Sequence, residues 1–163
     1  MSIFSTKVVL AIDGSEEASR AAEAAVELCE KTGSELHVVH LGEDVYLTSV
    51  TDLQLVLPAW AAQQYPDIET NFEQIARKVL DAEVEKVETA GGTVAQAHLR
   101  MGVADAEIVE LAEEIEAGLV VLGSRGLGGI RSALMDSVSY SVARHAHCPV
   151  LVVRDQQNAQ SPR

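Results

Sequence analysis

Short apolar runs alternate with helical patterns along this chain, and that alternation is what most restricts its possible folds. The runs Lys7–Ile12 and Leu119–Leu122 are almost continuously apolar, and Glu35–Leu41 is apolar at four of its seven positions. Runs of this kind are typical of strands buried on both faces of a parallel sheet. Two further strands are expected at Thr93–Leu99 and Val150–Val153. Strands separated by helices predict an α/β protein with a doubly wound, five-stranded parallel sheet between two layers of helices.

The helical segments have recognisable starts and ends. After the turn at Gly14, small apolar residues recur at helical spacing as far as Gly33, which closes the segment. A longer helical pattern runs from about Glu69 to Ala90, and another begins after Gly102. A last short helix is expected from about Ser137 to His145. Each helix therefore lies between two expected strands, and right-handed crossovers leave few other arrangements.

The chain length favours a single domain, because 163 residues can bury one proper core. We expect that domain to cover residues 1–154, with 155–163 as a polar tail. The segment Gly42–Ile68 shows no sustained period and is expected to be an inserted loop with short helical pieces. It is typical of a lid or contact surface, and equally of a segment that packs over a sheet edge.

The charge of the chain limits its partners. It carries 12 basic and 25 acidic residues, a formal net charge of −13. Because that charge repels nucleic-acid phosphates and anionic membrane surfaces, neither is expected as a partner. The N-terminus lacks a leader pattern, and no run approaches the roughly 20 apolar residues of a membrane span, so a cytoplasmic location is expected.

A glycine-rich stretch follows the strand Leu119–Leu122. Its glycines are Gly123, Gly126, Gly128 and Gly129. Backbone without Cβ atoms can direct its N–H groups toward an anion, and the start of the following helix adds partial positive charge. The position after a central strand and the presence of Arg125 and Arg131 favour a phosphate-binding segment over glycines that only form tight turns.

Other chemistries lack their signatures. The chain has neither the P-loop pattern nor a GxGxxG opening a helix directly after a strand. His145, His147 and Cys148 lie close in sequence but without the spacing of a zinc site. The Gly-Ser-Arg-Gly stretch is not a nucleophile elbow, and no general base is apparent. We therefore predict neither a catalytic residue nor a metal-binding residue.

Three blocks of the sequence, in this order, resemble the universal stress protein family. They are KVVLAIDGSEEASRAAEAA, VVHLGED and VVLGSRGLGGIRSALMDSVSYSVARHAHCPVLVVR. The resemblance implies an adenine nucleotide alpha hydrolase-like fold with strand order 3-2-1-4-5 and a bound adenine nucleotide, ATP or AMP. It also implies a stress-response sensor or regulator that hydrolyses ATP slowly at most. An unidentified protein partner would recognise its nucleotide-bound conformation. The family's homodimers, formed through the last strand, would use Val150–Val153.

One position departs from the pattern of the nucleotide-binding members. Their motif Gly-x2-Gly-x9-Gly-[Ser/Thr] matches Gly123, Gly126 and Ser137, but Asp136 replaces the third glycine. A carboxylate there repels phosphates unless Mg²⁺ bridges the two. Alternatively, Asp136 caps the last helix and occupies the anion site itself, which would leave a nucleotide-free homodimeric interaction module.

The same resemblance implies the remaining site residues. Asp13 would contact the nucleoside and the backbone of Leu41 would face the adenine. Ser137 and Ser139 would contact the phosphates beside Arg125. From the residues alone, Asp13 is equally typical of a turn, and serines near a helix start are equally typical of caps, so these alternatives stay open.

Overall fold

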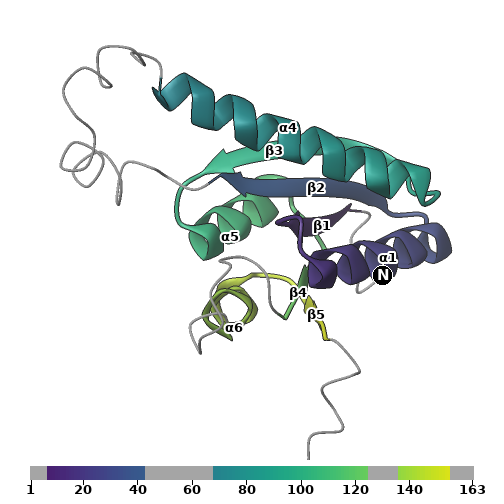
Figure 1. The fold of residues 1–163 in the computed structure, drawn as a ribbon. Helices are drawn as coiled ribbons and strands as arrows, with labels where there is room; N and C mark the ends of the chain where they lie inside the picture. The colour runs from purple at the N-terminus through teal and green to yellow at the C-terminus, as the bar shows by residue number, and fades with distance from the viewer. Residues whose placement is uncertain (1–6, 43–67, 125–135, 155–163) are drawn as a thin grey trace, which may run out of the picture.

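Five parallel strands form one sheet in the order β3-β2-β1-β4-β5 (Figure 1). The structure, a computed structural model, describes residues 7–42, 68–124 and 136–154. The strands are β1 (Lys7–Ile12), β2 (Glu35–Gly42), β3 (Val94–Met101), β4 (Leu119–Gly123) and β5 (Val150–Val153). The predicted fold class and strand order are confirmed.

In the part of the chain that the structure describes, two helices cover each face of the sheet (Figure 1). The helices are α1 (Glu16–Thr32), α4 (Ile68–Thr89), α5 (Ala104–Glu114) and α6 (Asp136–His145). Helices α1 and α4 pack on one face, and α5 and α6 on the other. The side chains of β1 alternate between them, with Leu10 in the first core and Val9 in the second.

The boundaries differ from the expected ones by one or two residues. The largest difference is at the end of β3, which continues to Met101. Arg100 and Met101 pair with Leu41 and Gly42, so the neighbouring strand extends β3 beyond its apolar run. Strand ends of this kind depend on the pairing partner, which a single run of residues does not contain.

The start of α1 is held by side-chain capping. Ser15 is extended and its Oγ accepts a hydrogen bond from the amide of Ala18 at 3.1 Å. At the other end, Gly33 has φ of 68°, and its amide donates to the carbonyl of Cys29 at 2.8 Å. The Ser15 cap starts α1 shortly after the end of β1.

The outer strand β3 carries an irregularity. Its register shifts between Leu36 and His37, because Leu36 pairs with Val94 and His37 pairs with Gln96. Ala95 is therefore an extra residue in β3, as in a β-bulge. Bulges and charges on edge strands oppose pairing with another chain.

Two histidines connect β2 and β3 on the side covered by α5. His37 is 6% exposed, and its Nδ1 lies 3.1 Å from Nε2 of His98. The two rings are stacked with centroids 5.4 Å apart. Burial holds the pKa of His98 below its ordinary value, and the neighbouring His37 and Arg100 lower it further, while Glu114 acts in the opposite direction. Folding therefore favours the neutral form of His98.

None of the helices within residues 7–42, 68–124 and 136–154 is both long and apolar enough to cross a membrane.

The lowered pKa of His98 predicts a pH-dependent stability. As the pH falls below 6.5, the unfolded chain takes up a proton that folded His98 resists, so the free energy of unfolding decreases. The decrease ends once the pH is below the lowered pKa of the folded state. Urea unfolding at a series of pH values measures it, and His98→Gln should show a shallower dependence. Equal slopes for the two proteins would contradict the assignment.

Candidate functional site

The site is organised by the way β1 pairs with its two neighbours. Pairing with β2 continues to the last residue of β1, where Ile12 lies opposite His40. Pairing with β4 ends earlier, at Leu10 opposite Val121. The chain adds β2 and β3 on one side of β1 and β4 and β5 on the other, so the strand order reverses between β1 and β4. Ligands of doubly wound sheets bind outside the carboxyl ends of the strands at such a point.

Asp13, the first residue after β1, uses its two carboxylate oxygens differently. Oδ1 accepts a hydrogen bond from the amide of Ser15 at 2.9 Å, which closes the turn into α1. Oδ2 is buried and has no hydrogen-bond partner among the described residues. A buried carboxylate oxygen without a donor is costly, and such an atom indicates a missing partner. Asp13 is thus both the turn residue and a candidate ligand contact.

A buried histidine supports the residue before Asp13. Nδ1 of His40 lies 3.1 Å from the backbone oxygen of Ile12. Because a carbonyl oxygen only accepts, the ring nitrogen must donate, which fixes the tautomer with hydrogen on Nδ1. His40 is itself buried. The end of β1 is therefore held by β2 through a side chain as well as through the strand ladder.

The sequence reasoning missed Glu83. This residue of α4 is buried, and its Oε1 lies 3.9 Å from the position that a Cβ on Gly14 would take. Its partner is Lys86, with 2.5 Å between Nζ and Oε1. Leu80, Glu83 and Val87 are all buried residues at helical spacing. The sequence signal that could have identified Glu83 is a carboxylate at a position on the buried stripe of α4, because charged residues are rarely buried without a partner. Glu83 lies against the turn that carries Asp13.

Gly123 ends β4 beneath the first turn of α1. A Cβ at this position would lie 3.0 Å from the backbone carbon and from the Cβ of Glu17, and 3.1 Å from the carbonyl oxygen. The close approach of α1 is by itself a reason for glycine here, independent of any phosphate. The amide of the next residue, Ser124, donates to the carbonyl of Val153 at 2.8 Å. The β4 end is therefore fixed on both sides.

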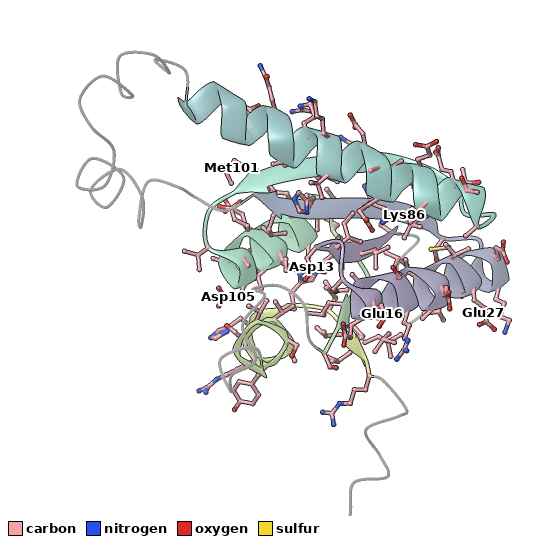
Figure 2. All side chains as sticks on the ribbon, viewed as in Figure 1. Asp13, Glu16, Glu27, Lys86, Met101 and Asp105 are labelled. Atoms are coloured by element: carbon pink, nitrogen blue, oxygen red, sulfur yellow. The ribbon has the colours of Figure 1, made fainter. Side chains whose placement is uncertain are left out.

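Exposed apolar residues lie at the carboxyl end of β3. Met101 is 39% exposed and Val103 is 59% exposed. Gly42 pairs with Met101, so this surface adjoins the end of β2. Figure 2 shows Met101 and Asp13 toward the end of the sheet at which β2 terminates. Sequence reasoning did not select these residues, although the turn at Gly102, with φ of 144°, marks the place.

The structure brings only some of the predicted site residues together. Asp13 and Gly123 lie at the same edge of adjacent strands, and Leu41 is the penultimate residue of β2. Ser137 lies in the first turn of α6, whereas Ser139 is buried. The atoms that cover Ser139 would have to move before a phosphate could contact it. Four predicted residues lie outside the described residues: Arg125, Gly126, Gly128 and Gly129.

The helix α6 begins at Asp136, one residue earlier than expected. The carboxylate-bearing residue is therefore in the first turn of the helix, where the helix dipole favours a negative charge. The structure does not describe its side chain, and both interpretations of Asp136 stay hypotheses.

The described part of the chain shows no grouping of metal ligands. Within residues 7–42, 68–124 and 136–154, no three His, Cys, Asp or Glu side chains could hold one metal ion. His147 places Nε2 3.0 Å from the carbonyl of Ala117, and His145 places Nδ1 2.8 Å from the carbonyl of Ser141. Burial raises the pKa of the Cys148 thiol. Both histidines thus lie within hydrogen-bonding distance of backbone carbonyl oxygens.

Comparison with known proteins decides the family. The model of the universal stress protein family matches residues 5–154. This chain belongs to the universal stress protein family. It is 32% identical to universal stress protein YxiE of Bacillus subtilis over 149 residues, which cover 91% of this chain and 98% of that protein.

Solved structures of the family share the fold. Universal stress protein UspA from Lactobacillus plantarum is 21% identical with a TM-score of 0.68, covering 91% of this chain and 97% of that one. A universal stress protein solved in complex with cAMP is 25% identical with a TM-score of 0.64, covering 93% of this chain and 98% of the other. The sequence resemblance is thereby confirmed at the level of family and fold.

The contact at Gly123 predicts a cost of adding one methyl group. Gly123→Ala should destabilise the protein by about 1–3 kcal/mol, because the neighbouring atoms belong mainly to the backbone of α1 and cannot rotate away. Denaturant unfolding measures this. Ser124→Ala is the matched control and should stay within about 0.5 kcal/mol of the unaltered chain. A Gly123→Ala protein as stable as the control would show that α1 does not approach β4 this closely.

Proposed function

We propose that this universal stress protein binds an adenine nucleotide at the carboxyl ends of β1 and β4. The observation that carries the proposal is Oδ2 of Asp13, a buried carboxylate oxygen that has no hydrogen-bond partner among the described residues and lies where the strand order reverses. A ribose hydroxyl is a donor of the kind that this oxygen lacks. The relative solved with cAMP supports an adenine nucleotide as the ligand.

The remaining contacts follow from the position of each residue. The backbone of Leu41 would face the adenine. The phosphates would lie over the amides of the glycine-rich segment and the start of α6, which together form an anion-binding arrangement. The segment contributes Gly123, Arg125, Gly126, Gly128 and Gly129, and the helix contributes Ser137 and Ser139. Asp136 would require Mg²⁺ between its carboxylate and the phosphates.

The proposed role is regulatory rather than catalytic. A bound nucleotide would stabilise one conformation of a cytoplasmic stress-response protein, which a protein partner then recognises. Hydrolysis would be slow or absent, since the described site contains Asp13 with one oxygen already engaged in the turn, and no base is positioned by a second side chain. The signal would thus depend on occupancy of the site.

Nucleotide binding is tested by calorimetric titration of ATP and AMP with and without Mg²⁺. We expect Asp13→Asn to weaken binding by about 10- to 100-fold, since a hydrogen bond to a charged group is lost. Asp81→Asn, on the exposed side of α4, is the matched control and should leave the affinity unchanged. Asp136→Gly should remove the need for Mg²⁺.

Two results would contradict the nucleotide proposal. If neither nucleotide binds the unaltered chain and Asp136→Gly gains affinity, Asp136 occupies the anion site and the chain is a nucleotide-free module. If Asp13→Asn binds as tightly as the Asp81→Asn control, the partner of Oδ2 is not the nucleotide.

We further propose that two copies pair through β5. The strands β3 and β5 are the two edges of the sheet. Edge β3 carries the bulge at Ala95 and the charge of Arg100, whereas β5 is the uncharged run Val150–Val153 with Leu151 37% exposed. An apolar edge without a charge, proline or bulge favours pairing with another strand.

Sedimentation analysis tests the dimer. We expect the natural chain to sediment at twice its mass of 17.4 kDa and Leu151→Lys to sediment as a monomer, because a charge would then face the apolar pairing edge. Val103→Lys places the same charge on another exposed apolar residue and should remain dimeric. A monomeric natural chain, or a dimeric Leu151→Lys, would refute pairing through β5.

A further inference from the structure

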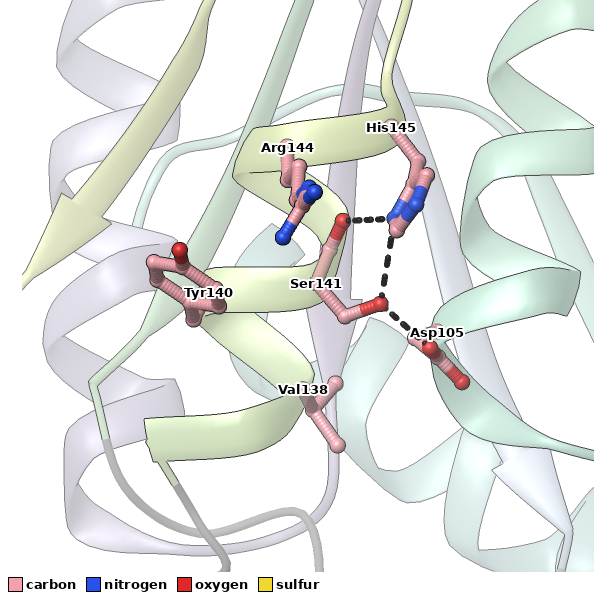
Figure 3. Close-up of a pocket in the computed structure, with 6 residues that line it drawn as sticks. All are labelled: Asp105, Val138, Tyr140, Ser141, Arg144 and His145. Atoms are coloured by element: carbon pink, nitrogen blue, oxygen red, sulfur yellow. Dashed lines mark hydrogen bonds between the residues drawn. The ribbon is translucent and has the colours of Figure 1, made fainter.

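A cleft lies between α5 and α6, on the face of the sheet opposite α1 (Figure 3). Its volume is about 350 Å³, within the range of small-molecule sites. The lining residues of this α5–α6 cleft are Asp105, Val138, Tyr140, Ser141, Arg144 and His145. None of them belongs to the proposed nucleotide site, so the cleft requires its own explanation.

One end of the cleft is an ordered polar cluster. The hydroxyl of Ser141 donates to Oδ2 of Asp105 at 2.5 Å. Nδ1 of His145 lies 2.8 Å from the backbone oxygen of Ser141 and 3.3 Å from its Oγ, so this ring nitrogen carries the hydrogen. The serine proton therefore points to the carboxylate and not to the histidine, unlike the order of a Ser-His-Asp triad. The cluster favours binding over nucleophilic catalysis.

Arg144, the arginine of the cleft, has no acidic partner among the described residues. Several exposed cations on the described helices pair with a glutamate of the same helix. These pairs are Lys31–Glu27, Arg77–Glu73 and Lys86–Glu83. Arg144 has no ion-pair or hydrogen-bond partner within residues 7–42, 68–124 and 136–154. The one carboxylate of the cleft, Asp105, is engaged by Ser141 instead. In a chain of net charge −13, an unpaired guanidinium in a cleft is available to an anion.

The rest of the lining is apolar surface. Tyr140 is 66% exposed, and Val138 lies one turn before Ser141 and is half-buried. An exposed tyrosine ring offers a flat face to another planar group. Figure 3 shows Tyr140 and Arg144 along α6, with Ser141 directed toward Asp105 of α5. The cleft thus combines a guanidinium, a flat apolar wall and a hydrogen-bond acceptor.

We propose that the α5–α6 cleft binds a small aromatic carboxylic acid that carries a hydrogen-bond donor away from its carboxylate. The carboxylate pairs with the planar fork of Arg144. The ring lies against Tyr140, and the donor binds Asp105, whose carboxylate keeps free lone pairs after accepting from Ser141. A second carboxylate on the ligand is repelled by Asp105.

The test uses 4-hydroxybenzoate as the probe, followed through the backbone amide signals of the ¹⁵N-labelled full chain. We expect saturable shifts at residues 138–145 with millimolar affinity, and weaker binding of benzoate, terephthalate and the neutral 4-hydroxybenzamide. Arg144→Gln should weaken the binding of 4-hydroxybenzoate by about tenfold or more. Arg154→Gln, an exposed arginine outside the cleft, is the matched control.

Two further variants sharpen the result. Asp105→Asn should remove the preference for 4-hydroxybenzoate over benzoate, and Asp13→Asn should leave binding at the cleft unchanged. The proposal is overturned if about 10 mM probe shifts none of these amides. It is equally overturned if Arg144→Gln lowers the melting temperature but binds the probe as tightly as Arg154→Gln, because Arg144 then only stabilises the end of α6.

Discussion

The pairing of β1 with both β2 and β4 is the constraint on which the rest of this structure depends. Because β1 lies in the middle of a parallel sheet, both of its faces must be covered, and its residues are buried in two separate cores. The crossovers then place α1 and α4 on one face and α5 and α6 on the other. The same arrangement reverses the strand order beside β1 and directs the residue after it, Asp13, to the edge where ligands bind.

Asp13 connects the fold to the proposed function, because its two carboxylate oxygens have different roles. One oxygen closes the turn from β1 into α1 and so contributes to stability. The other is buried without a partner among the described residues, in a turn that follows Ile12, whose carbonyl His40 of β2 holds. A site prepared in this way loses little conformational freedom on binding, which favours a ligand that supplies a donor.

Apolar runs, glycine positions and caps were enough to predict the sheet and the approximate ends of the helices, whereas the strand order came from the resemblance to the family. Features that arise only when distant segments meet could not be predicted. The bulge at Ala95 depends on the register against β2, and the burial of Glu83 depends on how α4 crosses the turn at Gly14. For Gly123, the sequence indicated a phosphate contact, whereas the structure adds the closeness of Glu17, which no local pattern contains.

The central claim is that Oδ2 of Asp13 accepts a hydrogen bond from the ribose of a bound nucleotide. The most direct measurement compares the affinities of ATP and 2′,3′-dideoxy-ATP for the unaltered chain and for Asp13→Ala. The account predicts that the unaltered chain prefers ATP by about tenfold or more, and that Asp13→Ala binds the two equally. An equal preference in both proteins would contradict it, because the ribose hydroxyls would then be recognised elsewhere or not at all.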